Sequence, residues 1–213
     1  MEFLPEKLDE YIVAKTAVEP ELLNKLNRET YQKVLIPRMC SGHFQGRVLS
    51  MLSHMIKPTN ILEIGTYTGY SAICMAEGMQ PGGKLITLDV NAELEDMVRR
   101  YVANANLTDV IDFRIGNALD IIPTIEEKLD LVFIDADKNN YSNYYDLVID
   151  KVNVGGYIVA DNVLWSGKVI EEIDPNDIDT PALQAYNTKI LNDPRVENVL
   201  FPIRDGLMVA RKL

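Results

Sequence analysis

The chain has 213 residues and a mass of 24.0 kDa, and its 47% hydrophobic and 25% charged residues are ordinary for a soluble globular protein with a substantial core. Its formal net charge of −11 disfavours a nucleic acid backbone or an anionic membrane as partner, because both attract clustered Lys and Arg, and it favours a small molecule. No apolar run approaches the roughly 20 residues that cross a bilayer, and the first residues show no signal-peptide pattern, so we expect one domain over residues 1–213 in the cytoplasm.

The first part of the chain is predicted to be helical. Residues 1–45 show helical spacing without strands, and we expect them to pack over a sheet or against a partner subunit. From Asn60 onward, short β-like runs alternate with stretches of helical period, which is typical of βα units in a parallel sheet. The pattern predicts strands at 60–64, 84–88, 110–115, 129–134 and 157–160, with helical faces over 48–56, 97–105 and 141–152.

The last part of the chain predicts a hairpin. After a helix near 181–191, residues 196–203 and 206–211 read as two strands joined by a tight turn at Arg204-Asp205, which places an antiparallel strand at the end of the sheet. The polar stretch 171–180 contains Pro175 and several Asp, so it is interpreted as a mobile loop or, equally, as a substrate lid.

A glycine-bearing turn follows the first predicted strand, in the pattern Glu63-x-Gly65-x-x-x-Gly69. Glycine has no Cβ, so a ligand can approach the backbone there, although glycine is also used simply to turn the chain. Asp89 closes the next strand about 20 residues later, the separation at which an acidic side chain accepts hydrogen bonds from ribose hydroxyls. The two features together predict a nucleoside cofactor.

The turn motif and the nearby carboxylates indicate which nucleoside cofactor is expected. A dinucleotide site is expected to carry G-x-G-x-x-G, which brings the backbone and a helix N-terminus to a pyrophosphate, and this turn does not match it. The carboxylates of Glu63, Asp135 and Asp137 instead suit a cofactor with an ammonium and a sulfonium group. S-adenosylmethionine has both groups, and it is the cofactor that the sequence favours.

Oxygen ligands follow two of the predicted strands. Asp135 comes after strand 129–134, and Asp161-Asn162 after strand 157–160, so these side chains are expected to meet at the carboxyl edge of a parallel sheet and to hold Mg²⁺. Because consecutive strand residues face opposite ways, Asp161 and Asn162 can share one ion only if the chain is already leaving the strand. An Asx turn or a helix cap is the alternative interpretation of this pair.

A lysine lies directly after the first of these ligands. Lys138 can accept a proton from a hydroxyl or orient its oxyanion, although a lysine after a strand is also commonly a solvated surface charge. Zinc and thiol chemistry are not indicated, because His43 and His54 stand alone and Cys40 and Cys74 form no CxxC motif. Both cysteines are interpreted as free thiols.

Several motifs belong together: Met39-Cys40-Ser41, the Glu63–Ser71 turn, Asp89, Gly116-Asn117-Ala118, Asp135-Ala136-Asp137-Lys138 and Asp161-Asn162-Val163-Leu164-Trp165. With these motifs, over nearly its whole length, the chain resembles the cation-dependent O-methyltransferases that include caffeoyl-CoA and catechol O-methyltransferases and their bacterial relatives. The resemblance implies a Rossmann-like class I methyltransferase fold, α/β, with a mixed seven-stranded sheet, helices on both faces and an antiparallel C-terminal strand. It also suggests a homodimer.

The resemblance further implies a set of site residues. Asp89 is expected to bind the ribose and Ala118 to lie near the adenine, while Trp165 and Ser166 are expected to border the acceptor pocket. In local terms, Ser41 can equally cap a helix, and Ala118 can be a small residue at a helix start. The residues expected to line the S-adenosylmethionine site are Ser41, Glu63, Gly65, Thr66, Ser71, Asp89, Ala118 and Asp137.

The resulting hypothesis is a divalent-cation-dependent O-methyltransferase that moves a methyl group from S-adenosylmethionine to a catechol or related phenolic molecule. Lys138 and Asp135 are the expected catalytic residues, and Asp135, Asp161 and Asn162 the expected ligands of Mg²⁺, with Mn²⁺ or Ca²⁺ as substitutes. The alternatives are methylation of a hydroxylated transfer RNA base, a nicotinamide-dependent oxidoreductase, and a non-catalytic nucleoside-binding module.

Overall fold

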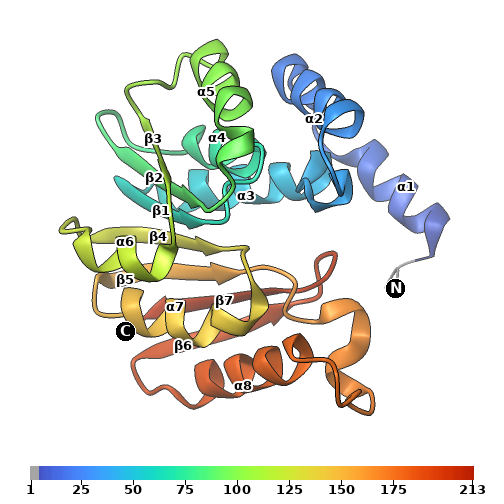
Figure 1. The fold of residues 1–213 in the computed structure, drawn as a ribbon, viewed down its shortest axis with the longest axis vertical. Helices are drawn as coiled ribbons and strands as arrows, with labels where there is room; N and C mark the ends of the chain where they lie inside the picture. The colour runs from blue at the N-terminus through green and yellow to red at the C-terminus, as the bar shows by residue number, and fades with distance from the viewer. Residues whose placement is uncertain (1–4) are drawn as a thin grey trace. The chain divides into compact units, whose positions relative to one another are not determined.

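The computed structural model describes residues 5–213, in which helices precede the first strand, helices and strands then alternate, and two strands end the chain (Figure 1). The chain forms two compact units, one that ends at Asn117 and one that runs from Ala118 to Leu213. The predicted single domain over 1–213, whose first four residues lie outside the described part, stays a prediction. The seven strands belong to one mixed sheet, which confirms the predicted fold class. None of the helices in the described part of the chain is long and apolar enough to span a bilayer.

The first unit contains three parallel strands in the order β3-β2-β1. The register places Glu63 of β1 beside Thr87 of β2, and Asp89 at the end of β2 beside Ile115 of β3. The elements of this unit are α1 (Glu6–Lys15), α2 (Glu21–Lys33), η1 (Pro37–Met39), α3 (Gly42–Ile56), β1 (Asn60–Ile64), α4 (Tyr70–Ala76), β2 (Lys84–Asp89), η2 (Ala92–Leu94), α5 (Glu95–Asn104) and β3 (Ile111–Ile115).

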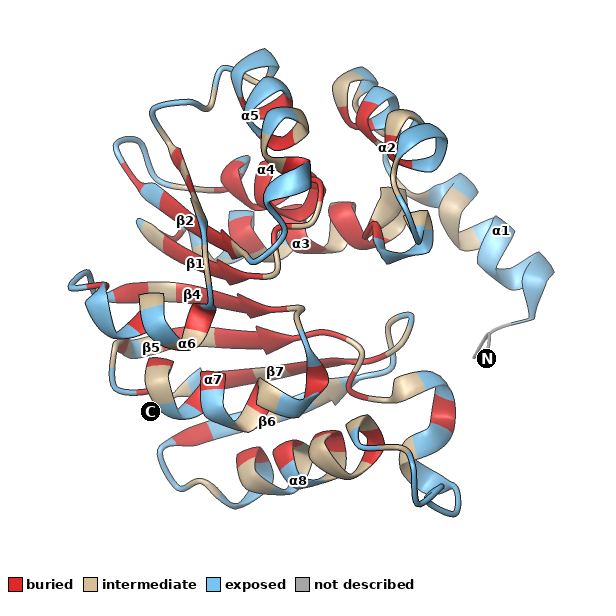
Figure 2. Cartoon of the chain, in the orientation of Figure 1, coloured by how far each residue is buried: buried red, intermediate tan, exposed pale blue. Residues whose placement is uncertain are grey.

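Helices of the first unit differ strongly in burial (Figure 2). Every residue of α4 is buried, because this short helix carries the apolar run that packs against α3 and β2. Helix α2 buries Leu23, Leu26 and Thr30 and packs against α3, α4 and α5, whereas α1 buries no residue. The predicted helical N-terminal segment is therefore confirmed over its described residues, and α2 is the part of it that joins the core.

The second unit contains four strands in the order β4-β5-β7-β6. β4 and β5 are parallel, and β7 is antiparallel to both β5 and β6. The C-terminal strand is thus antiparallel as predicted, but it lies inside the sheet, and β6 forms the end. The elements are α6 (Ala118–Ile121), η3 (Ile122–Thr124), β4 (Leu129–Ile134), η4 (Lys138–Asn140), α7 (Tyr141–Val148), β5 (Val152–Ala160), η5 (Trp165–Ile170), α8 (Asp179–Asn192), β6 (Val196–Phe201) and β7 (Leu207–Lys212).

One boundary differs clearly from the prediction. The helical face expected over 141–152 ends at Val148, and β5 already begins at Val152 rather than at Tyr157. Val152 pairs with Leu129, but the register shifts before Leu131, and Gly155 in the irregular stretch has φ +82°. Two adjacent glycines thus interrupt the apolar run that signals a strand, which hides its first half from the sequence pattern.

Helix α8 begins two residues before the predicted start at Pro181, so the last two residues of the 171–180 stretch are helical. The carboxylate of Asp177 accepts hydrogen bonds from the backbone N–H groups of Asp179 and Thr180 and from the Thr180 hydroxyl. Proline is tolerated in the first turn of a helix, because the N–H it lacks has no partner there. These hydrogen bonds to Asp177 hold the first turn of the helix ahead of the proline.

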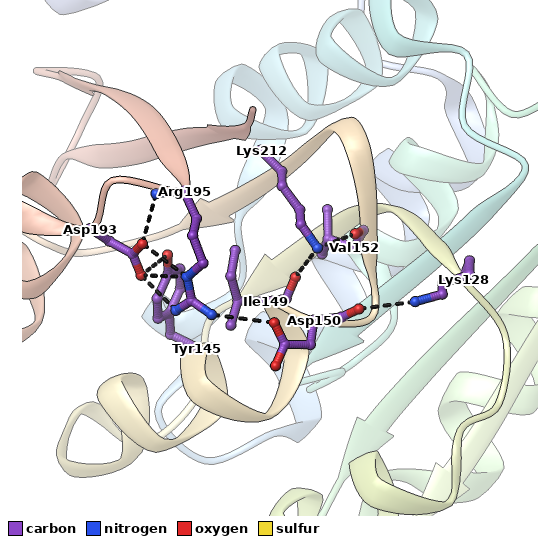
Figure 3. A network of polar contacts seen from close by, with 8 residues as sticks. All are labelled: Lys128, Tyr145, Ile149, Asp150, Val152, Asp193, Arg195 and Lys212. Atoms are coloured by element: carbon purple, nitrogen blue, oxygen red, sulfur yellow. Dashed lines mark hydrogen bonds and ion pairs between the residues drawn. The ribbon is translucent and has the colours of Figure 1, made fainter.

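The turn between α7 and β5 is held by a side chain of β7 and by side chains that come just before β4 and β6 (Figure 3). The Lys212 ammonium donates to the carbonyls of Ile149 and Val152 at 2.7 and 2.8 Å, and the Lys128 ammonium donates to the carbonyl of Asp150. Arg195 bonds the carboxylate of Asp150 and that of Asp193, its neighbour in the chain. These contacts give donors to the carbonyls between the end of α7 and the start of β5, at the end of β5 opposite to its carboxyl end.

Candidate active site

The glycine turn of the first unit joins β1 to α4, as predicted. Gly65 and Gly69 both lie in the left-handed region, with φ of +102° and +84°, where a side chain would be strained. The backbone N–H groups of Gly65 and Thr66 donate to the carbonyl of Leu88 at 2.9 and 3.2 Å. The turn is therefore fixed to the end of β2, directly before Asp89.

Glu63 is the buried charge beneath this turn, with no exposed surface. Its carboxylate accepts a hydrogen bond of 2.5 Å from the Ser71 hydroxyl and another from the Thr87 hydroxyl. The hydroxyls of Thr66 and Thr87 also bond each other. Because a buried carboxylate is costly without hydrogen-bond donors, these hydroxyls are what makes Glu63 tolerable at a strand end. Three of the expected cofactor residues, Glu63, Thr66 and Ser71, thus share one network.

Asp89 ends β2 with both carboxylate oxygens oriented by backbone donors. One oxygen accepts from the N–H of Tyr67 at 2.7 Å and the other from the N–H of Asn91 at 2.8 Å. A carboxylate has about four acceptor sites, so this arrangement fixes the side chain and leaves capacity for the hydroxyls of a ligand. The orientation is compatible with the predicted contact to a ribose.

Two further residues of the expected cofactor set, Ser41 and Ala118, lie where helices start, and both are buried. Ser41 precedes α3 but makes no side-chain capping hydrogen bond to that helix, which argues against the capping interpretation of its role. Ala118 is the first residue of α6 in the second unit.

The oxygen ligands of the second unit follow paired strand ends. Ile134 and Ala160 are paired at the ends of β4 and β5, and the N–H of Asp161 donates to the carbonyl of Ile134 at 2.9 Å. Asp135 and Asp161 therefore leave the sheet at the same edge. Asn162 has φ +59°, which shows that the chain has left the strand at that residue, as the sequence argument requires.

Lys138 brings the oxygens of two expected ligands together. Its ammonium donates to Oδ1 of Asp135 at 3.2 Å, to Oδ1 of Asn162 at 2.8 Å and to the hydroxyl of Tyr141 at 2.6 Å. The residue is only 8% exposed, so the interpretation of Lys138 as a solvated surface charge is wrong. Asp161 is 3% exposed, and its Oδ1 accepts from the N–H of Asn162.

This arrangement fits a hard cation. Two oxygens already converge on one positively charged atom, and carboxylate and amide oxygens are the ligands that Mg²⁺ prefers. Within residues 5–213, no three His, Cys, Asp or Glu side chains are grouped as a metal site, so the expected set needs the amide of Asn162 as its third ligand.

Comparison with known proteins decides the family. The model of a family described as O-methyltransferase matches residues 13–213. Caffeoyl-CoA O-methyltransferase 1 of Arabidopsis thaliana is 35% identical over 209 residues, which cover 92% of this chain and 79% of that protein. The chain belongs to the O-methyltransferase family. This match confirms the resemblance and the predicted enzyme class, an S-adenosylmethionine-dependent O-methyltransferase of the caffeoyl-CoA type.

Solved structures agree with the O-methyltransferase fold. The O-methyltransferase from Bacillus cereus in complex with SAH has a TM-score of 0.90 and 30% identity, and the match covers 97% of each chain. The O-methyltransferase TomG from Streptomyces achromogenes in complex with SAM has a TM-score of 0.87 and 26% identity, with 97% of this chain and 96% of that chain covered.

Three hydroxyl-bearing residues of this O-methyltransferase were not predicted as part of the site. Thr87 bonds Glu63, Tyr144 bonds the carboxylate of Asp137 at 2.5 Å, and Tyr141 bonds Lys138. Burial and the bond to Asp137 raise the pKa of Tyr144, so it stays a neutral donor. The spacing of apolar residues treats the two tyrosines only as apolar rings. Their hydroxyls, which Phe would lack, are what indicates that each needs a polar partner.

The loop after Asn162 brings an aromatic ring close to Lys138. Trp165 and Ser166 both have positive φ, and the Trp165 ring centroid lies 5.7 Å from the Lys138 ammonium. The Ser166 N–H donates to Asp205. The expectation that both residues border the acceptor stays a prediction, and the ring position agrees with it for Trp165.

The cysteines and histidines have structural surroundings. Cys40 and Cys74 are buried and form no disulfide, which agrees with their interpretation as thiols. Burial raises the pKa of Cys74 to about 12. His43 and His54 each bond a main-chain carbonyl, of Ala17 and of Ser50.

Proposed function

We propose that this O-methyltransferase transfers the methyl group of S-adenosylmethionine to one hydroxyl of a catechol-like or phenolic small molecule, with a divalent cation as cofactor. The observation that carries the proposal is the buried Lys138 ammonium between the oxygens of Asp135 and Asn162. Support also comes from the relatives, which include caffeoyl-CoA O-methyltransferases, and from neighbours whose structures contain SAH or SAM.

The first unit is proposed to hold the methyl donor. Asp89 accepts hydrogen bonds from the ribose, and the glycine turn at Gly65 allows close approach of the donor to the backbone. Glu63 places carboxylate oxygens beneath the turn, and these oxygens suit a ligand with an ammonium group better than a diphosphate. Ser41, Thr66 and Ser71 complete the proposed set within this unit, and Ala118 and Asp137 of the second unit stay predicted members of the cofactor site.

The second unit is proposed to prepare the acceptor. Asp135, Asp161 and Asn162 would hold Mg²⁺, for which Mn²⁺ or Ca²⁺ can substitute. A divalent cation held there would lower the pKa of an acceptor hydroxyl. In its neutral amine form Lys138 would take up the proton of the acceptor hydroxyl, and as an ammonium it would orient the oxyanion. The methyl carbon forms a bond to that oxygen and breaks its bond to sulfur, which leaves as a neutral thioether.

The experiment is methyl transfer from labelled S-adenosylmethionine to a panel of catechols and monophenols, with and without a chelator. We expect turnover of catechols that is lost on chelation and restored by Mg²⁺, and loss in Asp161→Ala. Asp150→Ala, which removes a carboxylate at the opposite end of β5, is the matched control and keeps its activity. Catechol turnover that survives thorough chelation contradicts the proposal.

The same assay includes the alternatives. Undermodified transfer RNA is offered as acceptor, and methylation of that RNA without catechol turnover would replace the small-molecule acceptor by a nucleic acid. The net charge of −11 disfavours that outcome. The cytoplasmic location and the homodimer stay predictions of the sequence.

A further inference from the structure

The Tyr141 side chain is the least exposed part of the Lys138 surroundings, with 0% of its surface accessible. Its hydroxyl contacts the Lys138 ammonium at 2.6 Å and the main-chain carbonyl of Asp161 at 2.9 Å. An ammonium can only donate and a carbonyl can only accept, so the phenol proton points to Asp161 and a lone pair points to Lys138. Both roles of the hydroxyl are thereby fixed.

The Tyr141 ring is also held in place. It packs edge-on against Tyr186, with ring centroids 5.5 Å apart and an interplanar angle of 84°. The ring contact and the hydrogen bond to Asp161 fix the position of the hydroxyl. A fixed hydroxyl is a rigid acceptor for the ammonium of Lys138.

The ammonium has three donors and three partners: Asp135, Asn162 and Tyr141. Two of these partners are proposed cation ligands, so their oxygens are required by the cation when it binds. Tyr141 is the partner that the cation does not require. It is also bonded to the main chain of Asp161, the third proposed ligand, so it connects the lysine to the strand end that carries the ligands.

We propose that Tyr141 is a positioning residue, whose hydroxyl holds the Lys138 ammonium at the strand ends while Asp135 and Asn162 turn to the cation. The proposal rests on the proposed function of Lys138. Without the hydroxyl, the ammonium keeps only the two ligand oxygens as partners. It then competes with the cation for those oxygens and is displaced from the acceptor when the cation wins.

Tyr141→Phe is the variant that tests this, because it keeps the ring and removes one oxygen. Mn²⁺ binding to the protein without methyl donor or acceptor is measured by titration. We expect the dissociation constant to rise about tenfold, the change that corresponds to one hydrogen bond to a charged group. The kcat for a catechol is expected to fall roughly 10- to 100-fold, with KM for both substrates within about twofold of wild type.

Tyr145→Phe is the matched control. Tyr145 lies on the same helix, is equally buried and also packs edge-on against Tyr186, but its hydroxyl donates to Asp193, away from Lys138. Tyr141→Phe loses two hydrogen bonds and Tyr145→Phe loses one, and both variants are expected to lower the melting temperature. Only Tyr141→Phe is expected to change Mn²⁺ affinity and kcat.

A double variant shows whether Tyr141 acts through Lys138. In a Lys138→Met background, the competing ammonium is gone, and adding Tyr141→Phe is expected to change the Mn²⁺ dissociation constant less than about twofold. A full effect in that background overturns the proposal, as does a Tyr141→Phe protein that matches Tyr145→Phe. If wild-type protein methylates catechols and Tyr141→Phe has no effect beyond that of Tyr145→Phe, this proposal is overturned and the proposed function stays intact. Wild-type protein that binds no Mn²⁺ overturns the proposed function, and this proposal with it.

Discussion

Replacing Thr87 by valine removes one hydroxyl from the interior of the first unit and keeps the shape of the side chain. Thr87 is fully buried in β2, beside Glu63 in the register, and its hydroxyl bonds both the Glu63 carboxylate and the Thr66 hydroxyl. The loss of a hydrogen bond to a buried charged group costs about 1.5–3 kcal/mol. For a chain of this size, that corresponds to a fall in melting temperature of roughly 3–12 °C.

The assay is urea unfolding at neutral pH together with thermal melting, and S-adenosylmethionine affinity by calorimetry gives a second readout. We expect Thr87→Val to weaken cofactor binding as well, because Glu63 loses a donor that orients it. Thr188→Val is the control, since the exposed Thr188 hydroxyl only donates to the carbonyl of Gln184 within α8. A Thr87→Val protein within about 0.5 kcal/mol of that control would refute the reasoning on the buried carboxylate.

Three further outcomes are expected. Hydrogen bonds from Arg100, Lys33 and Tyr101 lower the pKa of Glu29 from 4.5 to about 2. Wild type is therefore expected to be more stable than Glu29→Gln at neutral pH, and this difference is expected to disappear as the pH falls from 4.5 towards 2. Urea unfolding at each pH measures it. Cys74, whose pKa burial raises to about 12, is expected to react with iodoacetamide only after unfolding, and rapid labelling of native protein would contradict its buried position. Lys212→Met is expected to cost about 1–3 kcal/mol, because two carbonyls lose their donor, while methyl transfer stays at the wild-type rate.

The sequence was most informative where side chains follow buried strands. The apolar run before Asp135 and the run before Asp161 each predict a strand, and the carboxyl ends of parallel neighbours must meet at one edge. From that geometry alone, Asn162 had to leave the strand, and its φ of +59° agrees. Asp89 was found in the same way, by its spacing from the glycine turn.

The rest depends on contacts that no local pattern encodes. The first half of β5 was missed because Gly155 and its neighbour interrupt the hydrophobic alternation, although Val152 still pairs with Leu129. Thr87 and Tyr141 have the hydrophobic spacing of core residues, and their hydroxyls become informative only when the partner is known. The partner is set by register for Thr87 and by the turn at η4 for Tyr141.

The account's central claim is that Asp135, Asp161 and Asn162 hold one divalent cation beside Lys138. The most direct measurement is a crystal structure of the protein with Mn²⁺, SAH and a catechol, with anomalous scattering to locate the metal. We expect one anomalous peak at about 2.0–2.2 Å from oxygens of the three side chains, with both catechol oxygens at the same ion. A structure with Mn²⁺ bound elsewhere, and with Lys138 still bonded to Asp135 and Asn162, would contradict the account.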